Sequence, residues 1–190
     1  MKKALSILTA AMTAALVTGC ASGPKKMSSD PRLDYLQEGA VVQLQYNLHP
    51  NELTKTVPAM NYQPSALLTR CTPVTIVSFN KAQVVFALES GVQYRWVFDK
   101  HLRSDRAKHF SEFFVPQCDK LDGLSEVDQQ GIVDGQAFEG MTRKGVLYAL
   151  GLPPDHATPN LEQSQWTYWK NKFARMIVTF DSDGKVTQVK

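Results

Sequence analysis

The sequence contains 190 residues, with 21 lysine and arginine and 18 aspartate and glutamate side chains, and its formal net charge at pH 7 is +3. These charges nearly balance, so the chain lacks the strongly basic surface that nucleic-acid binding requires. A chain of this length suits one domain or two small ones.

Residues 1–19 have the order of a secretory signal peptide, with a charged start, an apolar run over residues 4–17 and small residues before Cys20. The apolar run is shorter than the about 20 residues that a spanning helix needs. The stretch LVTGC resembles a bacterial lipobox, which implies cleavage after residue 19 and acylation of Cys20. An ordinary signal peptide with an incidental cysteine is the alternative.

A multiply acylated Cys20 would anchor the mature chain firmly in a membrane, because each buried methylene contributes about 0.8 kcal/mol. Ala21 lacks the aspartate that keeps the resembling enterobacterial lipoproteins at the inner membrane. We therefore expect a lipid anchor in the outer membrane, on its periplasmic face. Residues 20–33 are polar and have no apolar period, which predicts a solvated tether.

Two further cysteines, Cys71 and Cys118, remain in a compartment that would be oxidising, where a disulfide between them is expected. In the chain-entropy treatment such a bond stabilises the fold by about 4 kcal/mol. A catalytic cysteine is the alternative, but no sequence feature pairs a histidine with either thiol.

The composition of residues 34–118 predicts a small antiparallel β-barrel with a short helix, SH3-like by analogy of fold. Apolar and polar residues alternate from residue 41, and three strands follow a loop rich in proline and asparagine, in PVTIVSF, AQVVFALE and VQYRWVF. The connections between these three stretches are short enough for hairpins.

The stretch SDRAKHFSEFF predicts the short helix, with Ser104 as its N-cap. Asp105, His109 and Glu112 share one face of it and could hold a divalent ion, but the same spacing describes a solvated helix face. Because no second histidine stands at ligand spacing, we expect no metal. We also expect no cofactor and no catalytic residue, since the sequence has no G-x-S-x-G, H-E-x-x-H or phosphate loop.

Residues 119–135 are acidic, contain glycine and have few apolar side chains, which predicts a linker between two halves. The next stretch, GMTRKGVLYALGLP at residues 140–153, has two glycines beside a lysine and a threonine, as phosphate loops do. Gly145 is followed by Val146 rather than by lysine and a hydroxyl residue, so a Walker loop is excluded.

The same stretch has the end signals of a short helix. Thr142 is the predicted N-cap, and Met141 and Val146 are placed for a hydrophobic staple. Gly151 is predicted to end the helix in a left-handed conformation, with Leu152 making the apolar contact of a Schellman cap.

Alternating residues predict strands in QWTYWK and ARMIVTF, and DSDGKV predicts a tight turn into a last strand. This turn places Phe180 opposite Val186 on the face that buries the helix, and Ile177 opposite Val189 on the other face. The second face is too apolar for water alone. We expect the first half of the chain to cover it, with a partner as the alternative.

The order GMT at residues 140–142, LGLP at 150–153, WTY at 166–168 and FDSDGKV at 180–186 closely resembles the SmpA/OmlA domain of BamE-like outer-membrane lipoproteins. The resemblance covers residues 136–190. It implies a helix pair packed on a three-stranded antiparallel sheet, and a role without catalysis as an accessory subunit or envelope-integrity factor.

Together these features predict an α+β, non-enzymatic lipoprotein that binds another envelope protein and has no small-molecule substrate. Trp166, Tyr168 and Trp169 are the candidate contacts, because interfaces favour tryptophan and tyrosine. Burial in the core is the competing interpretation for the first two of them. A periplasmic enzyme inhibitor or a peptidoglycan-binding protein is the alternative function.

Overall fold

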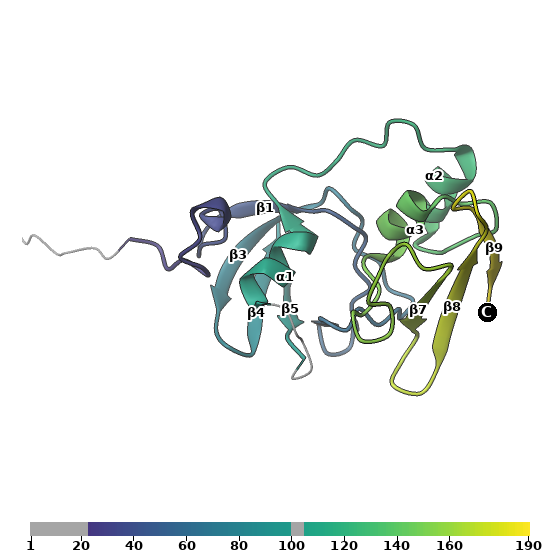
Figure 1. The fold of residues 1–190 in the computed structure, drawn as a ribbon. Coiled ribbons are helices and arrows are strands. Elements are labelled where there is room, and N and C mark those ends of the chain that lie inside the picture. Colours follow the sequence, from purple (N-terminus) through teal and green to yellow (C-terminus); the bar gives the residue numbers. More distant parts are fainter. Residues whose placement is uncertain (1–22, 100–104) are drawn as a thin grey trace, which may run out of the picture.

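The computed structural model describes residues 23–99 and 105–190 (Figure 1). The predicted signal peptide, the predicted lipidation site Cys20 and the predicted N-cap Ser104 lie outside the described residues. Within the described part the fold is α+β, with a six-stranded sheet in the first half, up to residue 118, and a three-stranded sheet in the second half, from residue 119. None of the helices in these ranges has the length and apolar character of a membrane span.

The first sheet has the strand order β2-β5-β4-β3-β1-β6 and is curled. The three strands predicted in quick succession are confirmed as the antiparallel β3, β4 and β5. β2 pairs with β5 in parallel, so the prediction of a wholly antiparallel barrel is wrong at this edge. β2 lies at the edge of the sheet away from β1, so the chain crosses the sheet between these two strands. The strands are β1 (Val41–Leu44), β2 (Thr56–Pro58), β3 (Pro73–Phe79), β4 (Gln83–Leu88), β5 (Gln93–Val97) and β6 (Phe114–Val115).

The helix of the first half, α1 (Arg106–Phe113), begins one residue later than predicted. Its N-cap is Asp105, whose carboxylate accepts hydrogen bonds from the backbone N–H groups of Ala107 and Lys108, both at 3.0 Å. Serine and aspartate are comparably good N-caps, so the adjacent pair in the sequence does not decide between them. Phe110 fixes α1 to the sheet, since its side chain is fully buried in the first hydrophobic core.

The described part of the predicted tether, residues 23–33, packs on the first half instead of extending freely. It contains a 3-10 helix, η1 (Pro31–Leu33), and the Met27 N–H donates to the Leu36 carbonyl at 2.8 Å. Met27 also packs against the first hydrophobic core. Leu33 does the same, but two apolar residues six positions apart create no period in a sequence, which is why this packing was not predicted.

Residues 119–135 contain the helix α2 (Glu126–Asp134), so the prediction of a linker is wrong for this segment. Its N-terminus is a capping box in which Ser125 and Asp128 each bond the backbone N–H of the other. It ends at Gly135, which has the left-handed φ of 64°. The helix has few apolar side chains because its stability comes from packing on the next helix rather than from a wide apolar face.

The helix predicted in GMTRKGVLYALGLP is confirmed as α3 (Arg143–Leu150), with Thr142 as its N-cap. The Thr142 hydroxyl accepts a hydrogen bond from the Gly145 N–H at 2.9 Å. The prediction for the other end is wrong, because Gly151 combines a φ of 76° with a ψ of −174°, which is not the conformation of a Schellman cap. Leu152 instead packs against the first core, so the chain leaves α3 in an extended conformation toward the first half.

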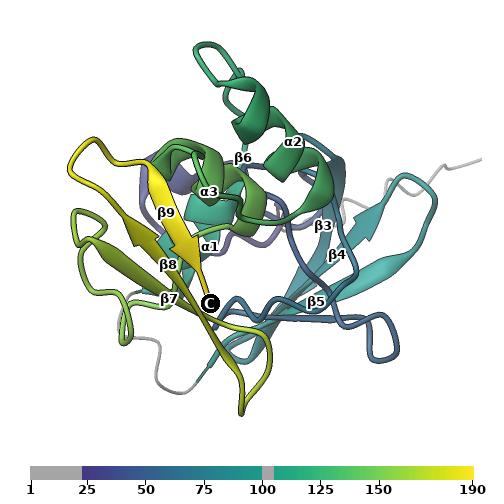
Figure 2. The ribbon, with the colours of Figure 1, turned by 90° about the vertical axis from the view of Figure 1, so that its right-hand side faces the viewer.

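The helices α2 and α3 and the second sheet enclose the second hydrophobic core (Figure 2). The strands are, in sheet order, β7 (Gln165–Trp169), β8 (Arg175–Phe180) and β9 (Val186–Val189). Phe180 lies opposite Val186, as predicted. Val189 lies opposite Val178 and not opposite Ile177, because the register of the pair shifts just before Phe180. The shift turns Val189 toward the helices, where it packs against the second core.

The outer face of the second sheet thereby loses one of the two apolar residues for which a cover was predicted. The first half meets this sheet at the edge of β7. There the Gln63 N–H donates to the Trp169 carbonyl at 2.8 Å, and Tyr62 forms a bridge with Trp169. The two halves therefore share a strand edge.

Candidate functional site

The last turn of α3 is completed by residues of the first half. A helix leaves its last four carbonyls without partners inside the helix. The Gly151 N–H bonds the first of them at 2.7 Å. The other three lie against the Asn47 N–H at 3.0 Å, His49 Nε2 at 3.2 Å and Asn61 Nδ2 at 2.7 Å. The acceptors are, in order, the carbonyls of Leu147, Tyr148, Ala149 and Leu150. Helix α3 therefore ends inside the first half.

The part of the first half that carries Asn47 and Asn61 also contacts α2. Asn47 Nδ2 donates to the Ile132 carbonyl in α2 at 2.6 Å, and its Oδ1 accepts from the Arg70 N–H at 2.8 Å. Asn61 Nδ2 makes a second bond, to the Leu152 carbonyl at 2.8 Å. Both asparagines are buried. The chain on both sides of β2 thus holds the ends of both helices through buried hydrogen bonds.

His49 occupies a position between two acceptors. Its Nδ1 lies 3.2 Å from the Pro64 carbonyl, on the opposite side of the ring from Ala149. A neutral imidazole has one N–H, so it can donate to only one of the two carbonyls at a time. Burial lowers the pKa of His49, and the two carbonyls oppose this effect only in part. The neutral ring therefore predominates at pH 7.

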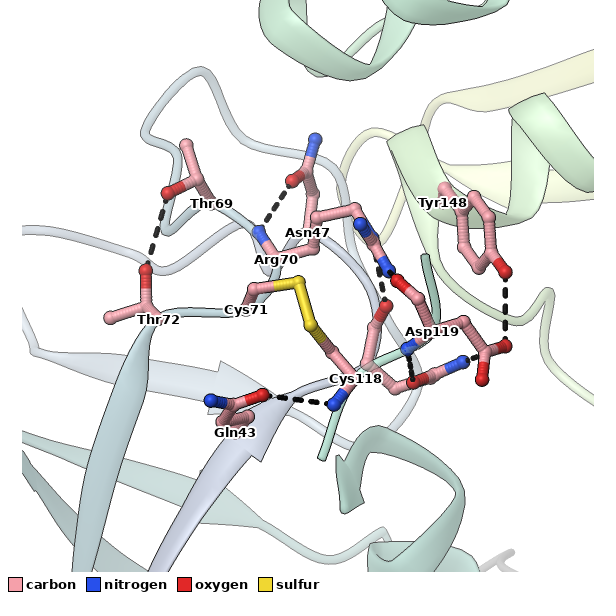
Figure 3. The surroundings of a disulfide bond; sticks show 10 residues. Gln43, Asn47, Thr69, Arg70, Cys71, Thr72, Cys118, Asp119 and Tyr148 are labelled. Atoms are coloured by element: carbon pink, nitrogen blue, oxygen red, sulfur yellow. Dashed lines mark hydrogen bonds between the residues drawn. A yellow bond between two sulfur atoms is a disulfide. The ribbon is translucent and has the colours of Figure 1, made fainter. Parts of the chain in front are cut away.

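The predicted disulfide between Cys71 and Cys118 is confirmed, with their Cα atoms 5.4 Å apart (Figure 3). It holds the segment that carries Asp119 against the first sheet. The Asp119 carboxylate accepts hydrogen bonds from Gln45 Nε2 at 2.6 Å and from the Tyr148 hydroxyl of α3 at 2.9 Å. Burial, and then the bond to Asp119, raises the pKa of Tyr148 to about 12. A covalent bond thus positions a carboxylate that ties α3 to the first half.

A cavity of about 340 Å³ lies between the halves, beside the end of α3, and we call it the junction cavity. Its volume is within the range of ligand-binding pockets. The floor is made of buried side chains from both halves and the rim of exposed polar ones. The floor includes His49, Ala137, Leu150 and Met176, and the rim includes Ser65, Asp134, Gln136 and Lys170. Such a floor and rim are the usual construction of a binding site.

Two of the three aromatic residues predicted as partner contacts belong to the core. Trp166 and Tyr168 have exposed fractions of 0%. Trp166 Nε1 donates to the Leu161 carbonyl at 3.0 Å, and the Tyr168 hydroxyl donates to the Gly151 carbonyl at 2.9 Å. A side chain with no exposed surface offers nothing to a partner, so the prediction is wrong for these two residues.

The third aromatic residue, Trp169, is half-buried at the edge shared with the first half. The His156 ring stacks on it at 6.4 Å, and the Arg175 guanidinium lies 4.8 Å from its ring centroid. Its Nε1 is buried without a hydrogen-bond partner in the described part of the chain. The neighbouring Lys170 lines the junction cavity. A contact between Trp169 and a partner stays a prediction.

The three residues considered as a metal site have separate roles. Asp105 caps α1, while His109 Nδ1 lies 3.6 Å from Glu112 Oε2. Among residues 23–99 and 105–190, no group of three histidine, cysteine or acidic side chains is placed to hold a metal ion. His109 and Glu112 line a second cavity of about 30 Å³, which is large enough for a water molecule but not for an organic ligand.

The polar side chains that join the halves were not predicted. His49, Asn61 and Gln63 lie in the long loop whose sequence shows no period. Their one signal in the sequence is the density of amide and imidazole groups, in YNLHP at residues 46–50 and NYQP at residues 61–64.

Comparison of the chain with known protein families, with curated proteins and with solved structures finds no match. Its class is therefore defined by its own geometry. In its described part it is a disulfide-bonded α+β protein whose two halves share buried hydrogen bonds and border a cavity of ligand size.

Proposed function

We propose that this chain is a non-enzymatic lipoprotein of the outer membrane that faces the periplasm and binds another envelope protein, as an assembly or integrity factor. The observation that carries the proposal is the junction cavity of about 340 Å³, whose lining comes from both halves. Its floor is fixed by core packing and by hydrogen bonds, which supports a preformed binding site.

Two features support the envelope as the location. The LVTGC stretch that ends at Cys20 favours acylation and anchoring through that residue. The disulfide between Cys71 and Cys118 fits an oxidising compartment, because thiols are kept reduced in the cytosol.

The proposal includes a finer description of the fold. Helices α2 and α3 packed on the antiparallel sheet β7-β8-β9 support a BamE-like second half. The resemblance runs over residues 136–190, so α2 (Glu126–Asp134) extends the helix pair beyond its start. The curled sheet with the successive strands β3, β4 and β5 around an aromatic core supports an SH3-like first half.

The anchor is tested by metabolic labelling with palmitate in an expressing bacterium. The wild-type chain should carry the label and fractionate with outer membranes, and Cys20→Ala should carry none. A wild-type chain without label would contradict the lipoprotein assignment.

Binding at the junction cavity is tested by capture of partners from detergent-solubilised envelopes. Leu67→Trp should fill the cavity, since Leu67 lines it, and should lose the captured envelope protein. Leu53→Trp is the matched control, because Leu53 is 97% exposed and does not line the cavity. Identical partners for Leu67→Trp and the wild type would reject the site.

A further inference from the structure

One backbone position of β9 is open to another strand. Ile177 and Lys190 exchange two hydrogen bonds, at 2.9 and 3.0 Å. The next pair, Val178 and Val189, is therefore of the non-hydrogen-bonded type, in which backbone groups point away from the partner strand. The Val189 N–H and carbonyl consequently face away from β8.

The other outward-facing position of β9 is already occupied by the chain itself. The Val186 N–H donates to the Met141 carbonyl and its carbonyl accepts from the Gly140 N–H, both at 2.8 Å. The segment before Gly140 then turns away toward α2. Among residues 23–99 and 105–190, the edge of β9 is thus paired at its start and unpaired at Val189.

The junction cavity lies beside this unpaired position. Val189 and Met176 of the second sheet line it together with Pro64 and Leu67 of the first half. A strand that pairs with Val189 would place an apolar side chain beside these groups, because side chains of paired strands stand next to each other.

The Gln63 side chain is a fixed part of the cavity lining. Gln63 Nε2 donates to the Asn61 carbonyl at 3.0 Å and to the Leu150 carbonyl at 2.9 Å, which fixes the orientation of the amide. Gln63 Oε1 is buried and has no hydrogen-bond partner in the described part of the chain. Because this oxygen has almost no accessible surface, the cavity presents other atoms of Gln63 to a ligand.

The edge carries part of the usual protection against pairing, because β9 has only 4 residues, its register against β8 shifts, and Lys185 and Lys190 flank it. Thr187, Gln188 and Val189 themselves include neither proline nor a charged side chain. The opening at Val189 is therefore suited to a short extended segment beside the cavity.

We propose that the occupant of the junction cavity is an extended segment of another polypeptide, which pairs with Val189 of β9 and places an apolar side chain on the cavity floor. This inference rests on the proposed binding function and specifies the chemistry of the partner. A strand offers the N–H and carbonyl groups that can pair with the Val189 backbone, whereas an acyl chain offers neither.

The test uses the chain from Ala21, which keeps both hydrophobic cores because these consist of residues from Met27 onward. The probes are labelled peptides in which threonine alternates with leucine, isoleucine, valine or phenylalanine. Matched peptides carry N-methyl groups on alternate backbone nitrogens and cannot pair with a strand. Binding is measured by fluorescence anisotropy, and amide hydrogen exchange reports on Val189 directly.

Val189→Pro removes the outward N–H without removing a bond to β8, because proline is tolerated at an edge position. The expected result is a loss of at least about tenfold in affinity, with a melting temperature that stays above that of Gln188→Pro because only packing of the Val189 side chain is lost. Gln188→Pro is the contrasting control, since it removes a group that pairs with Thr179 and should lower the melting temperature. The N-methylated peptides should not bind, and the Val189 amide should gain protection when the unmodified peptide binds.

The inference is overturned if no peptide of the panel binds at millimolar concentration, or if the Val189 amide gains no protection on binding. It is also overturned if the wild type forms a dimer that Val189→Pro abolishes, which would identify a second copy as the occupant. Should Val189→Pro unfold, Leu67→Trp must abolish peptide binding instead. Loss of captured partners in Leu67→Trp without any peptide binding would sink this inference and leave the proposed function standing.

Discussion

The two halves satisfy their polar backbone groups in different ways. The first half does so largely within itself, because its strands pair in one sheet and the disulfide between Cys71 and Cys118 joins the segment before β3 to the segment after β6. The second half leaves the last turn of α3 to donors from the first half. The second half therefore depends on the first for part of its structure, and we expect both to unfold in one transition.

The opposite end of α3 is satisfied inside the second half, by a carboxylate that serves two helices. Asp128 completes the capping box of α2 with Ser125, and it also accepts from the Thr142 N–H at 2.7 Å. The second bond is the one that a glutamate at the third position of α3 would make in a capping box of its own. That position is Gly145, where a Cβ would lie 2.0 Å from Asp128 Oδ1. The glycine makes room for a cap supplied by the other helix.

The largest effect is expected from removal of the disulfide bond in the first half. Cys71→Ser combined with Cys118→Ser should lower the free energy of unfolding by about 4 kcal/mol, because the bond joins residues 47 positions apart and restricts the unfolded chain. Denaturant unfolding with and without reductant measures the loss. Reductant should destabilise the wild type as much as the double substitution does, and it should leave the double variant unchanged.

The next largest effect is expected from loss of the hydrogen bonds between Asp128 and Thr142 in the second half. Gly145→Ala should cost about 3 kcal/mol, because the new methyl group displaces the Asp128 carboxylate from its bonds to Thr142. Thermal unfolding provides the measurement. Gly23→Ala is the control, since a Cβ there meets no atom within 4 Å. Equal melting temperatures for the two variants would refute the shared-carboxylate account.

A smaller effect is expected from loss of the Asn61 hydrogen bonds between the halves. Asn61→Gly should cost about 2 kcal/mol, because the Leu152 carbonyl loses its bond inside the protein. Glycine accommodates the positive φ of 50° at this position. Lys55→Gly, at a φ of 51° on the surface loop, controls for the backbone effect and should be nearly neutral. A separate early transition of the second half, seen by fluorescence of Trp166, would contradict a single cooperative unit.

The smallest expected effect is a dependence on pH at the same joint. Histidine in the unfolded chain titrates near 6.5, whereas the pKa of His49 in the folded chain is lower because the ring is buried. The unfolded state binds more protons between the two values, so the free energy of unfolding falls as the pH decreases through this interval. Denaturant unfolding at a series of pH values measures the slope. His49→Gln should reduce it, and an identical slope in both proteins would contradict the role of His49.

The elements that were predicted correctly have local signals. Thr142 is recognisable as an N-cap because its partner, the Gly145 N–H, is only three residues away. β3, β4 and β5 are recognisable from the alternation of apolar and polar residues and from the short turns between them. The disulfide followed from the number of cysteines and from the lipobox.

The features that were missed depend on contacts between distant residues. His49 lies 100 positions from the carbonyl that it contacts, and no pattern within the loop indicates such a partner. The helix α2 was missed because few of its side chains are apolar. In addition, Asp128 accepts a hydrogen bond from Thr142 at the start of α3, a contact that the sequence of α2 does not indicate. The register of Val189 was missed because a shift within a strand pair leaves no mark in the alternation of the sequence.

The last turn of α3 is embedded in the first half, which restricts how a ligand can enter the junction cavity beside it. Many proteins built from two parts grip a ligand by a hinge motion that brings the parts together. Here such a motion would break the buried bonds of Asn47 and Asn61 to the helix carbonyls. The opening should therefore keep its shape whether empty or filled, so that the ordering cost of association falls on the incoming molecule alone.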